Sequence, residues 1–297
     1  MDIVCNIDNR YVPYCGIMLT SLLDNNRDNE VNIHIVAATL SPDNIEILRS
    51  IVEDTFGARI NFYIVGDNLV KELPHFDNDY ISLSTYFRCF LTEILPSDIK
   101  KVIYIDCDLL VLNSLKPLWD TDISGYALAA VEDMNSSFTD KHRRLGLPES
   151  YLYFNAGVLL INLDYWRSHD VMNRLMIWMG QYRKRIVAHD QDLLNAVLSK
   201  EVTYLSHRWN MQEGMLRRRR HTLPSSESTI DQEMKQPAII HFAGKHKPWQ
   251  EKCINPYKPM WERYTDMSPW KGMRPQKHIG FTINRLTFPL QLSLIHI

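Results

Sequence analysis

The sequence predicts an α/β fold with a mainly parallel central sheet. Short apolar runs rich in β-branched and aromatic residues alternate with longer stretches of helical character, an order typical of parallel β-α-β units. One run, KVIYID at residues 101–106, is apolar almost throughout, as expected of a central strand buried on both faces. We find no internal repeat that would indicate a solenoid.

Each element has its own local signal. The helix after Pro13 has an amphipathic pattern, and Ser41 with Pro42 forms a typical helix start, with serine at the N-cap and proline in the first turn. Strands are expected at residues 1–7, 31–38, 59–65, 101–106, 126–133 and 156–163, with a short one at 239–241. Helices are expected at residues 14–26, 41–56, 84–95, 164–182 and 189–199.

Two segments depart from this alternation. Residues 211–236 combine MLRRRRH with SSESTIDQE and predict a long loop, a kind of segment that is usually functional or disordered. From about residue 265 the chain becomes basic and aromatic. We therefore expect one domain over residues 1–264 and a basic C-terminal tail over 265–297.

The composition is that of an ordinary soluble protein. Hydrophobic residues make up 45% and charged residues 23% of the 297 residues, and the net charge of −2 gives no reason to expect a nucleic-acid partner. Five cysteines without a C-x-x-C pair argue against a disulfide framework and suit a reducing compartment. The N-terminus MDIVCNIDNR lacks signal-peptide features, and no apolar run approaches the roughly 18 residues of a membrane span. We therefore expect a cytoplasmic protein.

Two acids close the strand at residues 101–106. Asp106 and Asp108 would point to the same side, and carboxylates this close repel each other unless a cation lies between them. Asp8 follows the first strand, so all three acids could meet where parallel sheets bind ligands. Alternatively, the strand ends at Ile105 and both acids are solvated turn residues. A phosphatase of the haloacid-dehalogenase type is disfavoured because LLVL follows the acids instead of a flexible turn.

Further polar clusters occur in YFNAGVLLIN (153–162), HDQDLLN (189–195) and IIHFAGKHKPW (239–249). Together with Asp8, STYFRCF and the D-x-D segment, and in this order, they resemble glycosyltransferase family 8. This retaining GT-A group includes lipopolysaccharide galactosyl- and glucosyltransferases. The resemblance covers roughly residues 1–262 and implies a single Rossmann-like nucleotide-binding domain.

The resemblance also implies a nucleotide-sugar donor site. Asp8 would accept the uracil imide proton, although Arg10 stands where relatives often have asparagine. Lys247 and the backbone around Gly244 would hold the diphosphate, where positive charge stabilises the leaving group. The full set implied for the donor is Asp8, Asn9, Arg88, Asp106, Cys107, Asn155, Asp190, Gln191, Gly244 and Lys247. Plainer roles stay open, namely helix or turn capping for the acids and amides and surface exposure for the two cations.

Catalytic and metal-binding residues follow from the same resemblance. Gln191 would lie beneath the anomeric carbon, and Asp133 would line the acceptor side. The catalytic set is Gln191, Asp190, Arg88 and Asn155. Asp106, Asp108 and His241 would bind one divalent cation, Mn²⁺ or Mg²⁺, and the imidazole favours manganese.

The implied partners are UDP-galactose or UDP-glucose as donor and a glycan acceptor that is lipid-linked. The basic, aromatic segment from Trp270 to Arg285 would then rest on an anionic membrane, which places the protein at the inner face. Three other readings remain: a glycogenin-like self-glucosylating enzyme, a UDP-sugar hydrolase of the same fold, and a non-catalytic glycan-binding protein.

Overall fold

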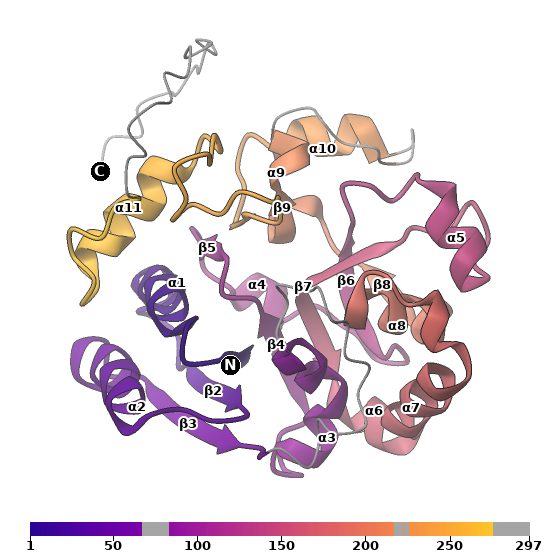
Figure 1. Ribbon diagram of the computed structural model, residues 1–297, viewed down its shortest axis with the longest axis horizontal. Helices are drawn as coiled ribbons and strands as arrows, with labels where there is room; N and C mark the ends of the chain where they lie inside the picture. Colours follow the sequence, from indigo (N-terminus) through magenta and orange to yellow (C-terminus); the bar gives the residue numbers. More distant parts are fainter. Residues whose placement is uncertain (67–82, 217–221, 223–225, 276–297) are drawn as a thin grey trace.

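The computed structural model describes residues 1–66, 83–216, 222 and 226–275 (Figure 1). Its centre is a seven-stranded sheet formed by these residues, in the order β3-β2-β1-β4-β7-β6-β8. The strands are β1 (Asp2–Asn6), β2 (Asn32–Ala37), β3 (Arg59–Ile64), β4 (Lys101–Ile105), β6 (Leu128–Glu132), β7 (Phe154–Asn162) and β8 (Val202–Tyr204). Strand β7 is antiparallel to both its neighbours, and the other pairs are parallel. The predicted mainly parallel α/β sheet is confirmed.

Alternate residues of the central strands enter two separate hydrophobic cores. In β4, Ile103 and Ile105 belong to one core, whereas Val102 and Tyr104 belong to the other. The first core is completed by helices α1 (Val12–Asp24) and α2 (Pro42–Arg49), and the second by α3 (Leu91–Ile94), α6 (Leu163–Ser168), α7 (Val171–Tyr182) and α8 (His189–Leu198). Because β4 is covered on both faces, its continuous apolar run is explained.

A small second sheet lies beside the large one, in the order β5-β10-β9. Its strands are β5 (Leu109–Val111), β9 (Met211–Gln212) and β10 (Ile239–His241). Leu110 and Ile240 pack with Ile17 of α1 and with Trp261 of α11 (Lys258–Met267) in a third core. Helix α1 is therefore buried on almost all sides, and the predicted amphipathic pattern is wrong for it.

Three predicted helices have a different internal geometry. Ser41 caps α2 as predicted, with its Oγ 3.3 Å from the Asn44 N–H, but residues Ser50–Thr55 continue as the π-helix η1. Residues Leu83–Phe90 form the 3₁₀-helix η3 before α3. The helix expected at 164–182 is divided into α6 and α7, and Asp170 between them has a left-handed φ of 49°.

The remaining short elements connect the cores. They are α4 (Lys116–Trp119), α5 (Thr139–Leu145), η4 (Arg183–Arg185), η5 (His207–Asn210), α9 (Glu213–Leu216) and α10 (Glu227–Glu233). The long loop predicted over 211–236 is thus wrong where β9, α9 and α10 form. The rest of that segment, 217–221 and 223–225, lies outside the described residues.

The predicted division after residue 264 does not coincide with a structural break. Helix α11 runs through it, and Trp270 packs on α1 so closely that a Cβ on Gly16 would come within 2.2 Å of its ring. Trp270 is therefore part of the folded domain rather than the free membrane anchor expected from sequence, because its ring fills space beside α1. Residues 276–297 lie outside the described part. Among the described residues, no helix has both the length and the apolar character needed to cross a bilayer.

Candidate active site

The D-x-D segment connects the two sheets. It follows β4 and precedes β5, and the Asp106 N–H donates to the carbonyl of Gly157 in β7 at 2.9 Å. The carbonyl of Asp108 accepts the N–H of Phe242, just after β10, also at 2.9 Å. One acid is thus fixed to the large sheet and the next to the small sheet. Neither is a freely solvated turn residue.

Asp106, Asp108 and His241 come together as predicted. One donor atom from each lies within 4.8 Å of the others, a spacing that suits a single divalent cation. Gly157 faces this cluster, and a Cβ there would come within 2.3 Å of His241 Cε1 and 3.0 Å of Asp106 Oδ2. The residues present therefore fit a cation: two carboxylates and an imidazole converge, and a glycine lets His241 and Asp106 pack directly against the β7 backbone.

Lys247 lies on the second acid of the segment. Its Nζ is 2.5 Å from Asp108 Oδ2 and 2.9 Å from the carbonyl of Phe242. Although burial alone would raise the pKa of Asp108, the neighbouring Lys247 ammonium and the hydrogen bonds from Lys247 and His241 outweigh it and hold this pKa well below its usual range. Sequence reasoning expected Lys247 at a diphosphate and missed its contact with Asp108.

Arg88 joins the first acid to the start of α8. Its guanidinium lies 2.9 Å from Asp106 Oδ1 and 2.9 Å from Asp190 Oδ2, and 4.1 Å above the ring of Tyr104. The side chain is buried, so the alternative of an exposed helical arginine is wrong. Tyr104, which sequence reasoning missed, also donates to Asp106 Oδ1 at 2.9 Å. Its position in β4, two residues before Asp106, was an available signal.

Asp190 is a buried carboxylate with an incomplete set of partners. Besides the charge of Arg88, no donor among the described residues makes a well-aligned hydrogen bond to its Oδ2. Burial raises its pKa to about 7, against the opposing charge of Arg88. The preceding His189 has a left-handed φ of 47°, a conformation that costs about 1 kcal/mol or more and is concentrated at functional sites.

Three further predicted residues form one polar cluster. Gln191 Oε1 accepts the Asn155 side-chain amide at 3.1 Å and the Ala156 N–H at 3.0 Å. Asp133 Oδ2 accepts from Asn155 at 3.2 Å and from Gln191 at 3.3 Å. Lys141 adds a charge at 3.5 Å from Asp133. Strand β7 and helix α8 thus present side-chain amides, and the residue after β6 presents a carboxylate, to the same place.

Asn210 is a member of the site that sequence reasoning missed. Its amide lies between His241 Nδ1 and Asn155 Oδ1, at 2.9 Å from each. The residue belongs to the short helix η5 in the segment RWNMQ, which carries no recognisable motif. No sequence signal distinguished it.

Asp8 and Asn9 fulfil local structural roles after β1. Asp8 Oδ1 accepts the N–H groups of Arg10 at 2.8 Å and Tyr11 at 3.1 Å, so it fixes the turn into α1. Asn9 Oδ1 accepts from the Ser41 N–H at 2.9 Å and joins this turn to α2. The N-cap residue of α1 is Tyr11, so Asp8 caps the preceding turn and the alternative of a helix N-cap at Asp8 is wrong.

Two predicted residues, Cys107 and Gly244, would contribute backbone groups rather than side chains to the site. Cys107 is buried between the two acids, with its Sγ 3.9 Å from the carbonyl of Asn6, and it contributes backbone rather than an exposed thiol. A Cβ on Gly244 would come within 2.3 Å of Glu213 Oε2, so a larger residue does not fit there without movement. All five cysteines are buried free thiols.

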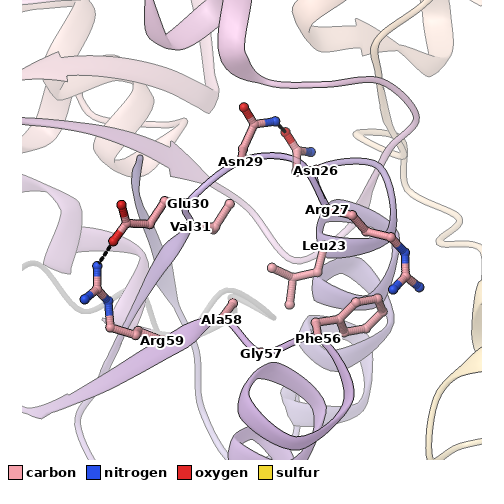
Figure 2. A pocket seen from close by; sticks show the side chains of 10 residues that line it. All are labelled: Leu23, Asn26, Arg27, Asn29, Glu30, Val31, Phe56, Gly57, Ala58 and Arg59. Atoms are coloured by element: carbon pink, nitrogen blue, oxygen red, sulfur yellow. Dashed lines mark hydrogen bonds and ion pairs between the residues drawn. The ribbon is translucent and has the colours of Figure 1, made fainter.

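A separate pocket of about 300 Å³ lies at the opposite, amino ends of β2 and β3 (Figure 2). Its two arginines are paired, Arg59 with Glu30 and Arg27 with Asp24. The pocket therefore offers little net charge and is remote from the D-x-D segment.

The comparison with known families decides the identity of this site. The model of glycosyl transferase family 8 matches residues 2–253. The chain belongs to glycosyltransferase family 8. Its fold is the GT-A fold, and the protein is a glycosyltransferase.

This family 8 glycosyltransferase is similar in sequence to several named proteins and in structure to solved glycosyltransferases. General stress protein A of Bacillus subtilis is 31% identical over 278 residues, which cover 91% of this chain and 94% of the relative. The galactosyltransferase LgtC, solved with donor and acceptor sugar analogues, matches with a TM-score of 0.81 at 30% identity and covers 91% of this chain and 96% of its own. The lipopolysaccharide glucosyltransferase WaaO of Escherichia coli is 24% identical, covering 92% and 79%.

Proposed function

We propose that this family 8 glycosyltransferase transfers galactose or glucose from a UDP-sugar to a glycan acceptor, with retention and an α-linkage, in a metal-dependent reaction. The observation that carries the proposal is the convergence of Asp106, Asp108 and His241 beside the buried pair of Arg88 and Asp190. A cation site and sugar-binding groups within one small region match the needs of a sugar diphosphate. The solved LgtC complex with donor and acceptor analogues supports the same assignment.

Asp106, Asp108 and His241 would hold Mn²⁺ or Mg²⁺. Carboxylate oxygens suit both ions, and the imidazole of His241 favours manganese. When bound, such an ion supplies Lewis-acid stabilisation of the departing diphosphate. Arg88 keeps Asp106 in place by its ion pair, and Tyr104 fixes the same oxygen.

The sugar would lie against α8 and β7. Asp190, buried and under-supplied with donors, would accept a sugar hydroxyl, and Asn155 would bind another. Gln191 would face the anomeric carbon; its Oε1 already accepts two N–H groups and an amide is a poor nucleophile. We therefore favour front-side attack, in which the anomeric C–O bond to the diphosphate breaks as the acceptor oxygen bonds on the same face. The acceptor proton passes to the leaving phosphate, and UDP departs.

The nucleotide would be bound around the end of β1. Asp8 would accept the uracil imide proton through Oδ2, which pairs with the exposed Arg10 guanidinium at 3.0 Å, and Asn9 and Cys107 would contribute alongside it. Lys247 and the backbone at Gly244 would hold the diphosphate. This role requires the Lys247 ammonium to move from Asp108 towards the phosphates.

The acceptor would be a lipopolysaccharide or another surface glycan, lipid-linked and bound next to Asp133. Its approach would be from the cytoplasmic side of the membrane, with the protein held there peripherally. Support comes from relatives named as lipopolysaccharide glycosyltransferases and from the basic residues in the sequence after 275.

A panel of UDP-sugars tests the proposal. The protein is dialysed against EDTA and incubated with UDP-galactose, UDP-glucose or UDP-N-acetylglucosamine, with Mn²⁺, Mg²⁺ or Ca²⁺ restored separately. We expect UDP release only with one hexose donor and with Mn²⁺ or Mg²⁺. Full activity without metal, or a mass gain of the protein by hexose units, would contradict the proposal. The second result would indicate self-glucosylation.

A further inference from the structure

Asn210 is buried completely at the end of η5, between the metal cluster and the sugar-side amides. One end of its side chain faces His241 Nδ1 and the other faces Asn155 Oδ1, at 2.9 Å each. A single amide therefore contacts a proposed metal ligand, His241, and a proposed sugar ligand, Asn155.

The direction of this chain of hydrogen bonds is fixed by the backbone. The Gly157 N–H can only donate, and it lies 3.0 Å from the Asn155 atom that also faces Asn210, so that atom is the carbonyl oxygen. Asn210 must then present its NH₂ group to Asn155. Its own oxygen consequently faces His241, and the Nδ1 of that ring must carry the proton.

The same reasoning fixes the far end of the chain. The Ala156 N–H donates to Gln191 Oε1 at 3.0 Å, so the Asn155 NH₂ group meets two acceptors, Gln191 Oε1 and Asp133 Oδ2. Each side-chain amide in this series of hydrogen bonds therefore has only one orientation in which every contact joins a donor to an acceptor.

We infer that Asn210 is a positioning residue: it sets the ring orientation and tautomer of His241 so that Nε2 faces the cation site, and it ties this ring to the sugar-binding amides. His241 Nε2 lies 3.3 Å from Asp108 Oδ1, on the side of the ring away from Asn210. Ligating histidines need such a partner on the other nitrogen, and its loss typically weakens metal binding about 10- to 100-fold. The inference rests on the metal site of the proposed function.

The backbone around Asn210 is anchored independently of its side chain. His207, in the same short helix, lies between Glu132 Oε2 at 3.3 Å and Glu233 Oε2 at 3.0 Å. The carbonyl of Arg208 accepts the Ala238 N–H at 2.8 Å, next to β10. A substitution of the Asn210 side chain is therefore expected to leave η5 in place.

Two substitutions separate the two ends of the amide. Asn210→Leu removes both hydrogen bonds at similar volume. Asn210→Asp keeps an acceptor for His241 Nδ1 but places an oxygen against Asn155 Oδ1, which repels it. Mn²⁺ binding to the full chain, without donor or acceptor, is measured by electron paramagnetic resonance and by calorimetry.

We expect Asn210→Leu to weaken Mn²⁺ affinity about 10- to 100-fold. Asn210→Asp should keep Mn²⁺ affinity within about threefold of wild type, yet lower turnover about tenfold or more because Asn155 is displaced from the sugar. The control is Asn26→Leu, a buried asparagine at the opposite end of the sheet that accepts the Leu115 N–H at 2.8 Å. It should lower thermal stability without changing Mn²⁺ affinity.

The outcomes distinguish the positioning role of Asn210 from the existence of the metal site. Wild-type Mn²⁺ affinity in Asn210→Leu, or an equal loss in Asn210→Asp, would overturn the positioning role while leaving the metal site standing. Failure of the wild-type protein to bind any divalent cation would overturn the metal site, and the role of Asn210 with it.

Discussion

The Lys247 ammonium nitrogen lies 2.5 Å from Asp108 Oδ2, at the carboxylate that also faces His241. A side chain of the protein therefore supplies positive charge where a metal ligand needs it. The ammonium group and a divalent cation would compete for the same oxygen. Removal of the ammonium group should therefore change the metal affinity.

Lys247→Met should raise Mn²⁺ affinity in the absence of donor, on the order of tenfold, because a competing charge is removed from a partly buried site. The same substitution should lower transfer from the UDP-sugar, since the diphosphate loses its cation. Calorimetry and steady-state kinetics measure the two effects. Lys258→Met is the control, because among the described residues that ammonium donates to the carbonyl of Gln250 and contacts no acid of the site. Unchanged Mn²⁺ affinity in Lys247→Met would exclude competition.

Asp108→Asn keeps the shape of the side chain and removes its charge. Metal affinity and turnover should fall together, about 100-fold or more, because both depend on the same oxygen atoms. His241→Ala should have a smaller effect in the same direction, with an unchanged circular dichroism spectrum. The exposed Asp122 provides a matched control, and Asp122→Asn should behave as wild type. Loss of turnover at full metal affinity would contradict the shared role.

Gly157→Ala should abolish metal binding, because the new methyl group would lie 2.3 Å from His241 Cε1 and force the ring to move. Gly180 in α7 is the matched control, since a Cβ there meets nothing within 4 Å. Gly180→Ala should stabilise the protein by about 0.5–1 kcal/mol, as expected within a helix. The paired measurements are Mn²⁺ affinity and the thermal midpoint. Normal Mn²⁺ affinity in Gly157→Ala would mean that the ring does not need this space.

Two aspartates in the first turn of α8 should respond to pH in opposite ways. Burial raises the pKa of Asp190 to about 7, above its unfolded value, so the folded state binds the extra proton between about pH 4 and pH 7. Its ionisation therefore lowers the free energy of unfolding as pH rises through 7. Asp190→Asn should gain stability relative to wild type on going from pH 5 to pH 8, in metal-free protein.

Asp192 should show the reverse. Burial alone would raise its pKa, but the Arg144 guanidinium at 2.7 Å and the N–H groups of Val187 and Ala188 lower it below the usual value. Its contribution to stability is present above the unfolded pKa of about 3.9 and is lost as pH falls through the folded pKa. Asp192→Asn should thus destabilise at neutral pH and lose this effect in acid. Thermal midpoints across pH measure both variants, and parallel curves would refute the assignment.

Deletion of residues 276–297 tests membrane contact. These residues contain Lys277, His278, Phe281 and Arg285, whereas Trp270 belongs to the packed domain. The shortened chain should keep its thermal midpoint but sediment less with anionic vesicles. Deletion from residue 265 should in addition destabilise the protein, because it removes Trp270 and the end of α11. Equal sedimentation of the full chain and the chain that ends at residue 275 would contradict a role of residues 276–297 in membrane binding.

Local patterns predicted the strands of the large sheet except the short β8, because burial on two faces leaves a long apolar run such as Val102–Ile105, whereas β8 has only three residues. They fail for α1, whose imperfect helical pattern predicts an amphipathic helix although a second sheet covers its other face. That sheet pairs Leu110 with Ile240, 130 positions apart, so only the folded chain reveals it. The run LLVL after the D-x-D segment is part of this sheet.

The spacing of Asp106 and Asp108 on a strand predicted a cation between them, whereas the other site residues were predicted by family resemblance and by the order of motifs. This approach found residues whose identity is typical of the chemistry, such as Asp106 and His241. It could not find Asn210, which acts through its position between two other side chains and has no pattern of its own. It also placed Lys247 at the phosphates without its contact to Asp108, because contacts between distant segments depend on tertiary packing.

The D-x-D segment carries a mechanical consequence beyond ligand binding. Asp106 is hydrogen-bonded to β7 in the large sheet, whereas Asp108 and His241 are held by the small sheet. A cation bound by all three residues would therefore connect the two sheets. At a free cation concentration 100 times its dissociation constant, it would add about 2.7 kcal/mol to the unfolding free energy. Local opening of β9 and β10 away from β7 would then require release of the ion, and slower amide exchange in these strands would report how tightly the two sheets are coupled.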